Sequence, residues 1–146
     1  MLIEGLAADT YIQTVVKTLE SVPAQVMLTD AIAEAYREGQ KRLANTADVS
    51  EVFSSSSDLR NASPYLFVTT GKAWLENKTL EQEVFGPLGL VVIVKNIDEL
   101  MHVAKSLEGQ ITCTLHLDQA DHHVASQLLP VLERKAGRIL ANSFPT

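Results

Sequence analysis

The chain has 146 residues, of which 46% are hydrophobic and 21% are charged, so its composition is that of a globular protein and not of a disordered one. Twelve lysines and arginines against 18 acids give a net charge of −6, which argues against nucleic-acid binding, because phosphate contacts need a basic surface. Cys113 is the single cysteine, which excludes an internal disulfide and a cysteine-rich zinc site and fits a reducing compartment.

The N-terminus and the apolar stretches give no signal for secretion or for a membrane span. The opening sequence MLIEGLAADTY lacks a basic segment and contains Glu4 and Asp9, unlike a signal peptide. The longest apolar stretch, residues 88–94, is far shorter than the roughly 20 residues that cross a bilayer. We therefore expect a soluble, cytoplasmic protein with no membrane partner.

Hydrophobic periodicity and turn residues predict the order of helices and strands. In chain order we expect helices at 7–22 and 31–43, strands at 51–53, 65–70 and 88–95, a helix at 98–108, a strand at 110–117, a helix at 118–135 and a strand at 138–141. Pro23 ends the first helix, Thr29 or Asp30 caps the second, and Pro130 is expected to kink or split the last. The polar residues 45–58 are typical of a solvated loop around one short strand.

The second half of the chain decides the predicted fold class. Residues 88–95 are apolar on consecutive positions, which is typical of a strand buried on both faces of a parallel sheet. Strands and helices then alternate, as in parallel βαβ units. We therefore predict an α/β fold with an open, mainly parallel sheet and helices on both faces. Because the chain opens on the strand-like MLIE and ends on FPT directly after a strand, we expect it to be part of a longer protein.

The loop before the buried strand carries the clearest candidate for a binding site. Glu83 and Phe85 are followed by the turn Gly86-Pro87. A carboxylate can accept hydrogen bonds from two neighbouring hydroxyls, as on a ribose, and an aromatic ring beside it offers a flat apolar face. Residue types alone also allow a simpler interpretation, a loop with a surface glutamate and a core phenylalanine.

The order of these residues resembles the aldehyde dehydrogenase superfamily. The pattern E-x-F-G-P at residues 83–87 leads into an apolar strand, and the end AGRILANSFPT is similar to a family segment in which a helix hands over to a strand ending in Asn142. The stretches VPAQVMLTDAIAEAYREGQKRL and ASPYLFVTTGKAWLEN look most like the branch that acts on 2-oxoglutarate semialdehyde and fatty aldehydes, often with NADP. The resemblance covers essentially the whole chain.

The resemblance implies that residues 1–146 belong to the second half of a catalytic domain. The enzyme would oxidise an aldehyde, such as 2-oxoglutarate semialdehyde, to a carboxylate through a cysteine thioester. It implies that Glu83 binds the hydroxyls of the nicotinamide ribose of NADP or NAD, that Phe85 packs beside that ribose, and that Phe144 helps to wall the aldehyde pocket. We find no counterpart of the family's nucleophilic cysteine, nucleotide-binding domain or C-terminal tail in the sequence, so no catalytic residue is assigned.

Two expectations follow for the chain on its own. It should be inactive, and it should associate as a homo-oligomer through surfaces that the rest of the parent enzyme would cover. The alternative is a free-standing α/β binding or interaction module without catalysis, because the missing nucleophile is compatible with both.

Cys113 and the histidines are not expected to carry chemistry. Cys113 lies mid-strand without a helix N-terminus to lower its pKa, and it does not match the family's nucleophile, so we expect a buried, inert thiol. The segment HLDQADHH contains metal-ligand residue types. However, His122 and His123 are adjacent on a predicted helix, about 100° apart, so both cannot easily reach one ion. We therefore expect no metal site. We expect the start of a solvated helix instead, where the positive end of the helix dipole favours the carboxylates of Asp118 and Asp121.

Overall fold

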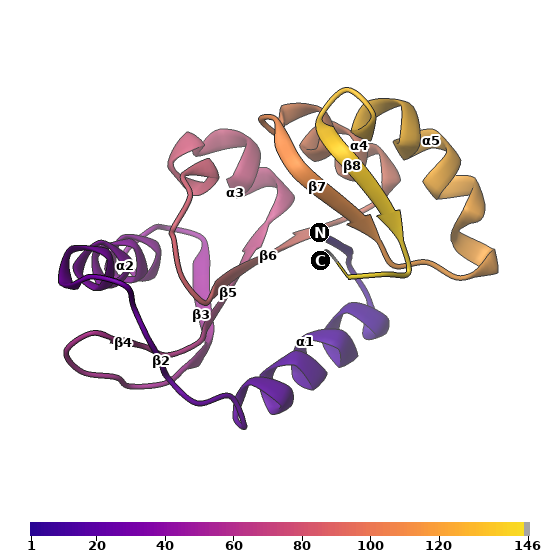
Figure 1. Ribbon diagram of the computed structural model, residues 1–146. Helices are drawn as coiled ribbons and strands as arrows, with labels where there is room; N and C mark the ends of the chain where they lie inside the picture. The colour runs from indigo at the N-terminus through magenta and orange to yellow at the C-terminus, as the bar shows by residue number, and fades with distance from the viewer. Residues whose placement is uncertain (145–146) are drawn as a thin grey trace. The chain divides into compact units, whose positions relative to one another are not determined.

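The structure is a computed structural model that describes residues 1–144 (Figure 1). Pro145 and Thr146, the last two residues of the segment AGRILANSFPT, lie outside the described residues. Two compact units divide the chain: the N-terminal unit over residues 1–95 and the C-terminal unit from residue 96 onward. Each unit has its own sheet and its own helices.

A four-stranded, mainly parallel sheet forms the centre of the N-terminal unit. Its strands, in spatial order, are β1 (Leu2–Ile3), β6 (Leu88–Val94), β5 (Tyr65–Thr70) and β3 (Val49–Ser54). β1, β6 and β5 run parallel, and β3 is an antiparallel edge strand with a register shift between Glu51 and Phe53. The predicted open, mainly parallel sheet is thus confirmed, and β5 has the predicted bounds.

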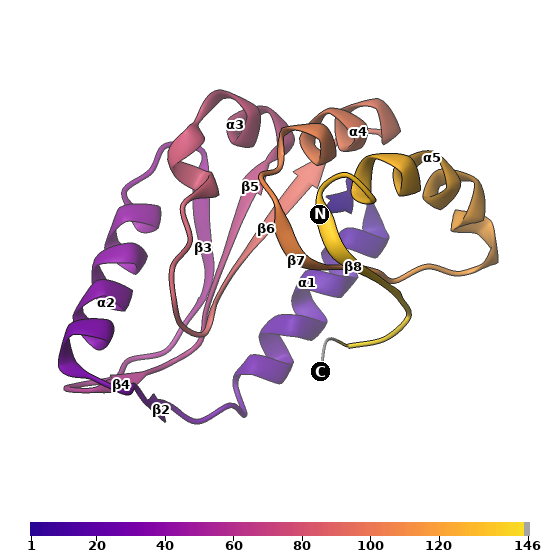
Figure 2. The same cartoon turned by 45° about the horizontal axis from the view of Figure 1, so that its top comes forward.

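Helices lie on both faces of this sheet, as predicted. They are α1 (Leu6–Leu19), α2 (Asp30–Ala44) and α3 (Gly71–Glu76), followed by the 3-10 turn η1 (Lys78–Glu81). Figures 1 and 2 show α2 and α3 on one face and α1 on the other. The predicted cap of α2 is confirmed, because Thr29 Oγ1 accepts the N–H of Ile32 at 3.2 Å.

The buried side chains of the N-terminal unit gather around α2 in two clusters. The first lies between α2 and a two-stranded antiparallel ribbon of β2 (Gln25–Val26) and β4 (Asn61–Ala62), and consists of Met27, Ala33, Tyr36 and Ala62. The second lies between α2, α3, η1 and the sheet, and consists of Leu43, Phe67, Ala73 and Leu80. Neither the ribbon nor α3 was predicted.

The C-terminal unit is a parallel βαβ unit with one further helix. It contains α4 (Ile97–Ser106), β7 (Gln110–Leu115), the 3-10 turn η2 (Gln119–Asp121), α5 (His122–Leu132) and β8 (Ala136–Ala141). β7 and β8 pair in parallel across the connection made by α5, and α4 contacts α5. This confirms the predicted strand–helix–strand unit. β7 and β8 form a two-stranded sheet of their own.

Pro130 was expected to kink or split the last helix, and it does not split it. α5 runs through Pro130 to Leu132. Proline removes one N–H donor from a helix, and here it does so near the C-terminal end, where the helix stops after two more residues. The discontinuity lies instead before α5, where η2 precedes His122.

None of the helices in the described part of the chain has the length and apolarity that a membrane crossing requires.

Candidate functional site

The segment Gln82–Pro87, called here the clamp loop, joins η1 to β6 and contains the residues singled out by the sequence. Glu83 and Phe85 both point outward, and 69% of Phe85 is exposed. The simpler interpretation of Phe85 as a core residue is therefore wrong. Among the described residues, no side chain or backbone group pairs with the Glu83 carboxylate, so both of its oxygens are free to accept hydrogen bonds.

Val84 and Leu88 fix the inner side of the clamp loop. Both side chains pack against each of the two buried clusters. Val84 lies against the backbone of Gly39 on α2, where an added Cβ would come within 2.5 Å of Val84 Cγ1. Alternation along the loop therefore turns Val84 inward and leaves Glu83 and Phe85 to the solvent.

Gly86 also lies close to α2. Its φ of 147° lies in a region that side-chain-bearing residues rarely adopt. An added Cβ would overlap the ring of Tyr36 on α2. Glycine is therefore required here by backbone conformation and by the contact with the ring.

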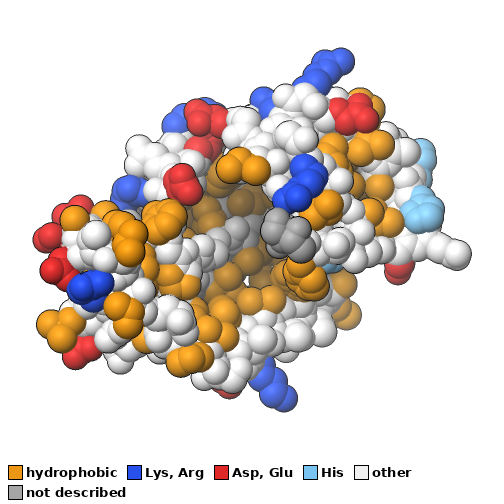
Figure 3. Space-filling model, viewed as in Figure 1, with side chains coloured by type: hydrophobic (Ala, Val, Ile, Leu, Met, Phe, Trp, Pro, Cys, Tyr) orange, Lys and Arg blue, Asp and Glu red, His pale blue; other side chains and the backbone are white. Residues whose placement is uncertain are grey.

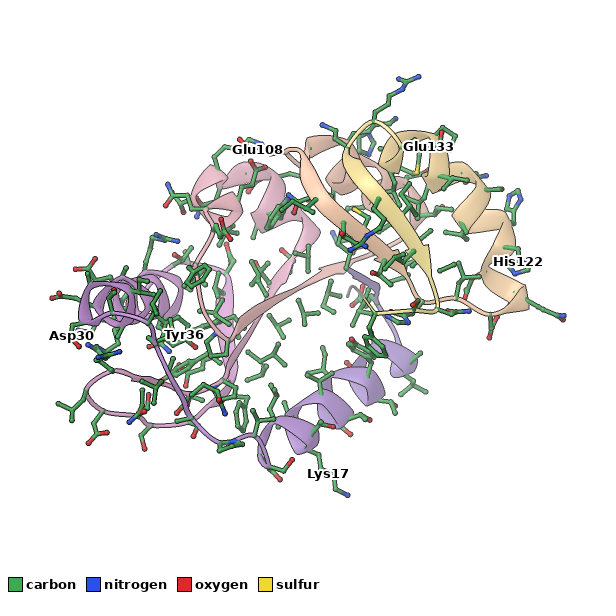
Figure 4. The ribbon with its side chains drawn as sticks, in the orientation of Figure 1. Lys17, Asp30, Tyr36, Glu108, His122 and Glu133 are labelled. Atoms are coloured by element: carbon green, nitrogen blue, oxygen red, sulfur yellow. The ribbon has the colours of Figure 1, made fainter. Side chains whose placement is uncertain are left out.

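Tyr36 connects the clamp loop to the rest of the N-terminal unit. Only 2% of the residue is exposed, and Figure 4 shows it on the side of α2 that faces the sheet. Its hydroxyl lies 2.6 Å from the carbonyl oxygen of Ser63 and 3.2 Å from that of Pro87. Burial raises the pKa of Tyr36. A side-chain hydrogen bond with Gln40 lowers it by a smaller amount, and Tyr65 raises it slightly. The pKa therefore stays above its usual value, so the hydroxyl keeps its proton and donates it.

Two further hydrogen bonds hold the ends of the clamp loop. The N–H of Tyr65 donates to Pro87 O at 3.0 Å, at the point where β5 and β6 begin to pair. Arg42 Nη2 on α2 donates to the carbonyl of Gln82 at 3.4 Å. The loop has no regular secondary structure of its own, so α2 and β5 set its conformation.

Phe144 belongs to the C-terminal unit, where it follows β8. It is 79% exposed, and its ring lies 5.7 Å from that of His116, between centroids. Asn142, with a φ of 47°, braces this segment. Its Oδ1 accepts the N–H of Leu117 and its Nδ2 donates to the carbonyl of Leu117, both at 2.9 Å. The end of β8 is thereby tied to the segment after β7.

Cys113 is half-buried in β7. Burial raises the pKa of its thiol, so the neutral form dominates near pH 7 and the thiolate nucleophile is scarce. This agrees with the expected inert thiol.

The acids of the segment HLDQADHH serve as helix caps. Asp118 accepts the N–H of Ala120, and Asp121 accepts that of Asp118 in a reciprocal capping box. His122 and His123 are exposed at the start of α5. In the part of the chain that the structure describes, no three His, Cys, Asp or Glu side chains come together in a way that could hold a metal ion.

Sequence reasoning missed the residues of α2 that hold the clamp loop in place. The sequence pattern places Tyr36 on one apolar face of its helix, together with Ile32, Ala35 and Leu43. The structure confirms Tyr36 and Leu43 as buried, adds Ala33 and Gly39 to the buried face, and leaves Ala35 exposed. A buried glycine between a tyrosine and a leucine at helical spacing is the signal that another chain segment approaches α2 closely there.

No protein-family model matches the chain. Curated proteins do match it, and two of them are alpha-ketoglutaric semialdehyde dehydrogenases. The alpha-ketoglutaric semialdehyde dehydrogenase 2 of Azospirillum brasilense is 40% identical over 146 residues, which are 99% of this chain and 28% of that protein. The alpha-ketoglutaric semialdehyde dehydrogenase of Acinetobacter baylyi is 33% identical over 147 residues, with the same coverage of 99% and 28%. The chain thus spans a little over a quarter of the length of these relatives.

Solved structures of aldehyde dehydrogenases have the same fold. A salicylaldehyde dehydrogenase from Pseudomonas putida G7 matches with a TM-score of 0.79 at 13% identity, over 99% of this chain and 31% of that one. A succinic semialdehyde dehydrogenase from Streptococcus pyogenes, in complex with NADP+, matches with a TM-score of 0.73 at 19% identity, over 99% and 33%. The resemblance to the aldehyde dehydrogenase superfamily and the predicted fold class are therefore confirmed.

Proposed function

We propose that this chain, which corresponds to a segment of aldehyde dehydrogenase superfamily proteins, contributes the nicotinamide-ribose clamp of an NAD(P)-dependent aldehyde dehydrogenase. The observation that carries the proposal is the clamp loop: an E-x-F-G-P segment whose Glu83 and Phe85 face outward while Val84 and Gly86 are anchored on α2. The enzyme would oxidise an aldehyde to a carboxylate. The names of the two curated relatives support 2-oxoglutarate semialdehyde as the substrate.

Glu83 is proposed to hold the cofactor. Its unpaired carboxylate suits two adjacent ribose hydroxyls, which donate while the carboxylate oxygens accept. Phe85, exposed beside it, offers a flat apolar face against the same ribose. When bound, the cofactor supplies a nicotinamide ring that accepts hydride. NADP and NAD both fit this role, because the ribose next to the nicotinamide is the same in both.

Phe144 is proposed to help wall the aldehyde pocket. Its exposed ring is available for apolar contact with a substrate, and Asn142 and His116 restrict the position of the segment that carries it. We assign no catalytic nucleophile or base within the chain, and we propose that residues 1–146 form part of the catalytic domain.

We further propose that the enzyme is cytoplasmic. The proposal rests on the single cysteine of the sequence, which cannot form a disulfide within the chain and fits a reducing compartment.

The function is tested on the full-length protein that contains this chain. With 2-oxoglutarate semialdehyde and NADP+ or NAD+, we expect reduced cofactor and 2-oxoglutarate in equal amounts. Succinic semialdehyde and a long-chain fatty aldehyde serve as comparison substrates. Absence of cofactor reduction with all three aldehydes would contradict the proposal.

The chain of 146 residues by itself should neither oxidise aldehydes nor bind NAD(P) with micromolar affinity. Glu83 supplies one or two charge-assisted hydrogen bonds, each contributing roughly 1.5–3 kcal/mol at best. A micromolar complex requires about 8 kcal/mol. Calorimetric titration with NADP+ checks this, and a micromolar dissociation constant would show that the chain holds more of the cofactor site than we propose.

The chain should also self-associate. Its described residues include large apolar side chains that are at least 70% exposed, namely Leu6, Val26, Leu28, Leu59, Ile111 and Phe144. Figure 3 shows hydrophobic side chains gathered at the end of the N-terminal unit where β2 and β4 lie. Exposed apolar surface of this kind drives association. Sedimentation velocity should show species heavier than the 16.0 kDa monomer as concentration rises, whereas a single monomer boundary at every concentration would contradict this.

A further inference from the structure

We propose that Tyr36 is a positioning residue for the cofactor site: its hydroxyl fixes the clamp loop so that Glu83 is presented to the ribose in one orientation. The inference rests on the proposed function of Glu83 and goes beyond it, because Tyr36 itself lies behind the loop and touches no ligand.

The outward side chains cannot fix the loop. Glu83 has no partner among the described residues, and Phe85 is 69% exposed. The position of the carboxylate therefore depends on the backbone of the clamp loop. That backbone is held from the inside, through the contacts of Val84 with Gly39 and of Gly86 with Tyr36.

Tyr36 is the point at which three segments meet. Its ring packs against the backbone of Gly86. Its hydroxyl lies within hydrogen-bond distance of the carbonyl oxygens of Ser63, just before β5, and of Pro87, just before β6. One hydroxyl has one proton, so it donates to Ser63 O, the nearer oxygen at 2.6 Å, while Pro87 O accepts the N–H of Tyr65.

The hydroxyl of Tyr36 fixes the position of the ring, which packing of the ring alone does not do. The ring limits how far Gly86 can move toward α2, since it fills the space that a Cβ at Gly86 would occupy. The hydrogen bond to Ser63 fixes where along β5 the ring sits, and thereby where the loop rests. Tyr36→Phe keeps the ring and removes the hydrogen bond, which leaves the buried carbonyl of Ser63 without this donor.

The experiment compares two variants of the full-length enzyme that each lose one hydrogen bond made by a buried side chain. Tyr36→Phe loses the bond to Ser63. Thr69→Val loses the bond from Thr69 Oγ1 to Asp48 O, 2.8 Å long, at a residue that is 2% exposed and lies outside the clamp loop. Both variants change a side chain with little change in volume, and both are assayed well below their thermal midpoints. Matching circular dichroism spectra establish that both are folded.

We expect Tyr36→Phe to raise KM for the cofactor about fivefold, the factor that one neutral hydrogen bond corresponds to. KM for the aldehyde should change less than twofold. The variant should also show a primary isotope effect on kcat with an aldehyde deuterated at the reacting carbon, because a loosely held ribose slows hydride transfer. Thr69→Val should leave both KM values and the isotope effect unchanged, although its thermal midpoint falls by a similar amount.

The role of Tyr36 is overturned if the two variants lose stability alike and neither changes KM for the cofactor or the isotope effect. Glu83→Gln, assayed in parallel, distinguishes a failure of the positioning role of Tyr36 from a failure of the proposed ribose clamp. If Glu83→Gln changes KM for the cofactor or the isotope effect and Tyr36→Phe changes neither, only the positioning role of Tyr36 is rejected. If Glu83→Gln is silent too, the proposed clamp fails and the role of Tyr36 fails with it.

Discussion

Gly86→Ala should lower the free energy of unfolding of the N-terminal unit by about 3–4 kcal/mol, from backbone strain at a positive φ together with overpacking, each of which costs about 1–3 kcal/mol. The added methyl group would have to occupy the space of the Tyr36 ring, which is buried and hydrogen-bonded and therefore cannot easily move away. Urea unfolding followed by the fluorescence of Trp74 measures the change, because Trp74 is the only tryptophan of the chain and packs against the core of this unit.

Gly5 provides the matched control. Its φ of 145° is close to that of Gly86, but an added Cβ would meet nothing within 4 Å. Gly5→Ala therefore carries the backbone strain without the overlap and should cost about 1–2 kcal/mol. Equal losses in the two variants would mean that contact with Tyr36 contributes nothing, and the anchoring of the clamp loop on α2 would have to be abandoned.

Phe67→Ala should cost about 3–5 kcal/mol, the range observed when a buried phenylalanine is truncated. Phe67 lies on β5 between two neighbouring strands, is fully buried, and joins α2 and α3 to the sheet through Leu43, Ala73 and Leu80. The cavity would open beneath the segment that Tyr65 and Pro87 hold together. The same urea titration at one fixed protein concentration measures the loss.

Phe144→Ala removes an equally large ring from an exposed position and should change stability by no more than about 0.5 kcal/mol. A loss of several kcal/mol for Phe144→Ala would show that its ring is covered in solution, for example by self-association. A loss below about 1 kcal/mol for Phe67→Ala would contradict the described core.

The elements that sequence analysis predicted well have a strong local pattern. The strand Tyr65–Thr70 is rich in aromatic and β-branched residues, and the helix Asp30–Ala44 has both a capping threonine and an apolar face. In both cases local preference and tertiary burial agree, so a short window of sequence is sufficient.

The elements that were missed are short and have no such pattern. The strands β2 and β4 have two residues each and are held by pairing across more than 30 residues of chain. α3 has one turn and a half, and its N-terminal signal is a single hydrogen bond from the N–H of Ala73 to Thr70 Oγ1. Pairing partners and one-turn helices depend on tertiary contacts, which hydrophobic periodicity does not record.

The residues of the candidate site also fall into those that the sequence identified and those that it did not. Glu83, Phe85 and the turn at Gly86 could be found in the sequence, because they are consecutive and form a motif. The partners of the Tyr36 hydroxyl could not, because Tyr36 lies 27 residues from Ser63 and 51 from Pro87, the two residues to which its hydroxyl is directed. The sequence thus indicated the side chains proposed to meet the ligand, and the structure supplied the residues that hold them.

The measurement that tests the account most directly is made on Glu83→Gln in the full-length enzyme. The substitution keeps the size of the side chain and removes its charge, so the hydrogen bonds from the ribose hydroxyls become neutral ones. We expect a loss of about 1–2 kcal/mol in positioning, which is roughly a tenfold slower hydride transfer. Attack on the aldehyde should be spared, because in the proposed site Glu83 contacts the ribose and not the reacting carbon.

Pre-steady-state kinetics with an aldehyde deuterated at the reacting carbon reports this step. Glu34→Gln is the control, since Glu34 is an exposed carboxylate on α2 outside the clamp loop. The account predicts that Glu83→Gln loses any burst of reduced cofactor and gains a primary isotope effect, while Glu34→Gln behaves as the unmodified enzyme does. If Glu83→Gln leaves cofactor affinity, burst and isotope effect unchanged, Glu83 is one more solvated acid in a loop and the ribose clamp is contradicted.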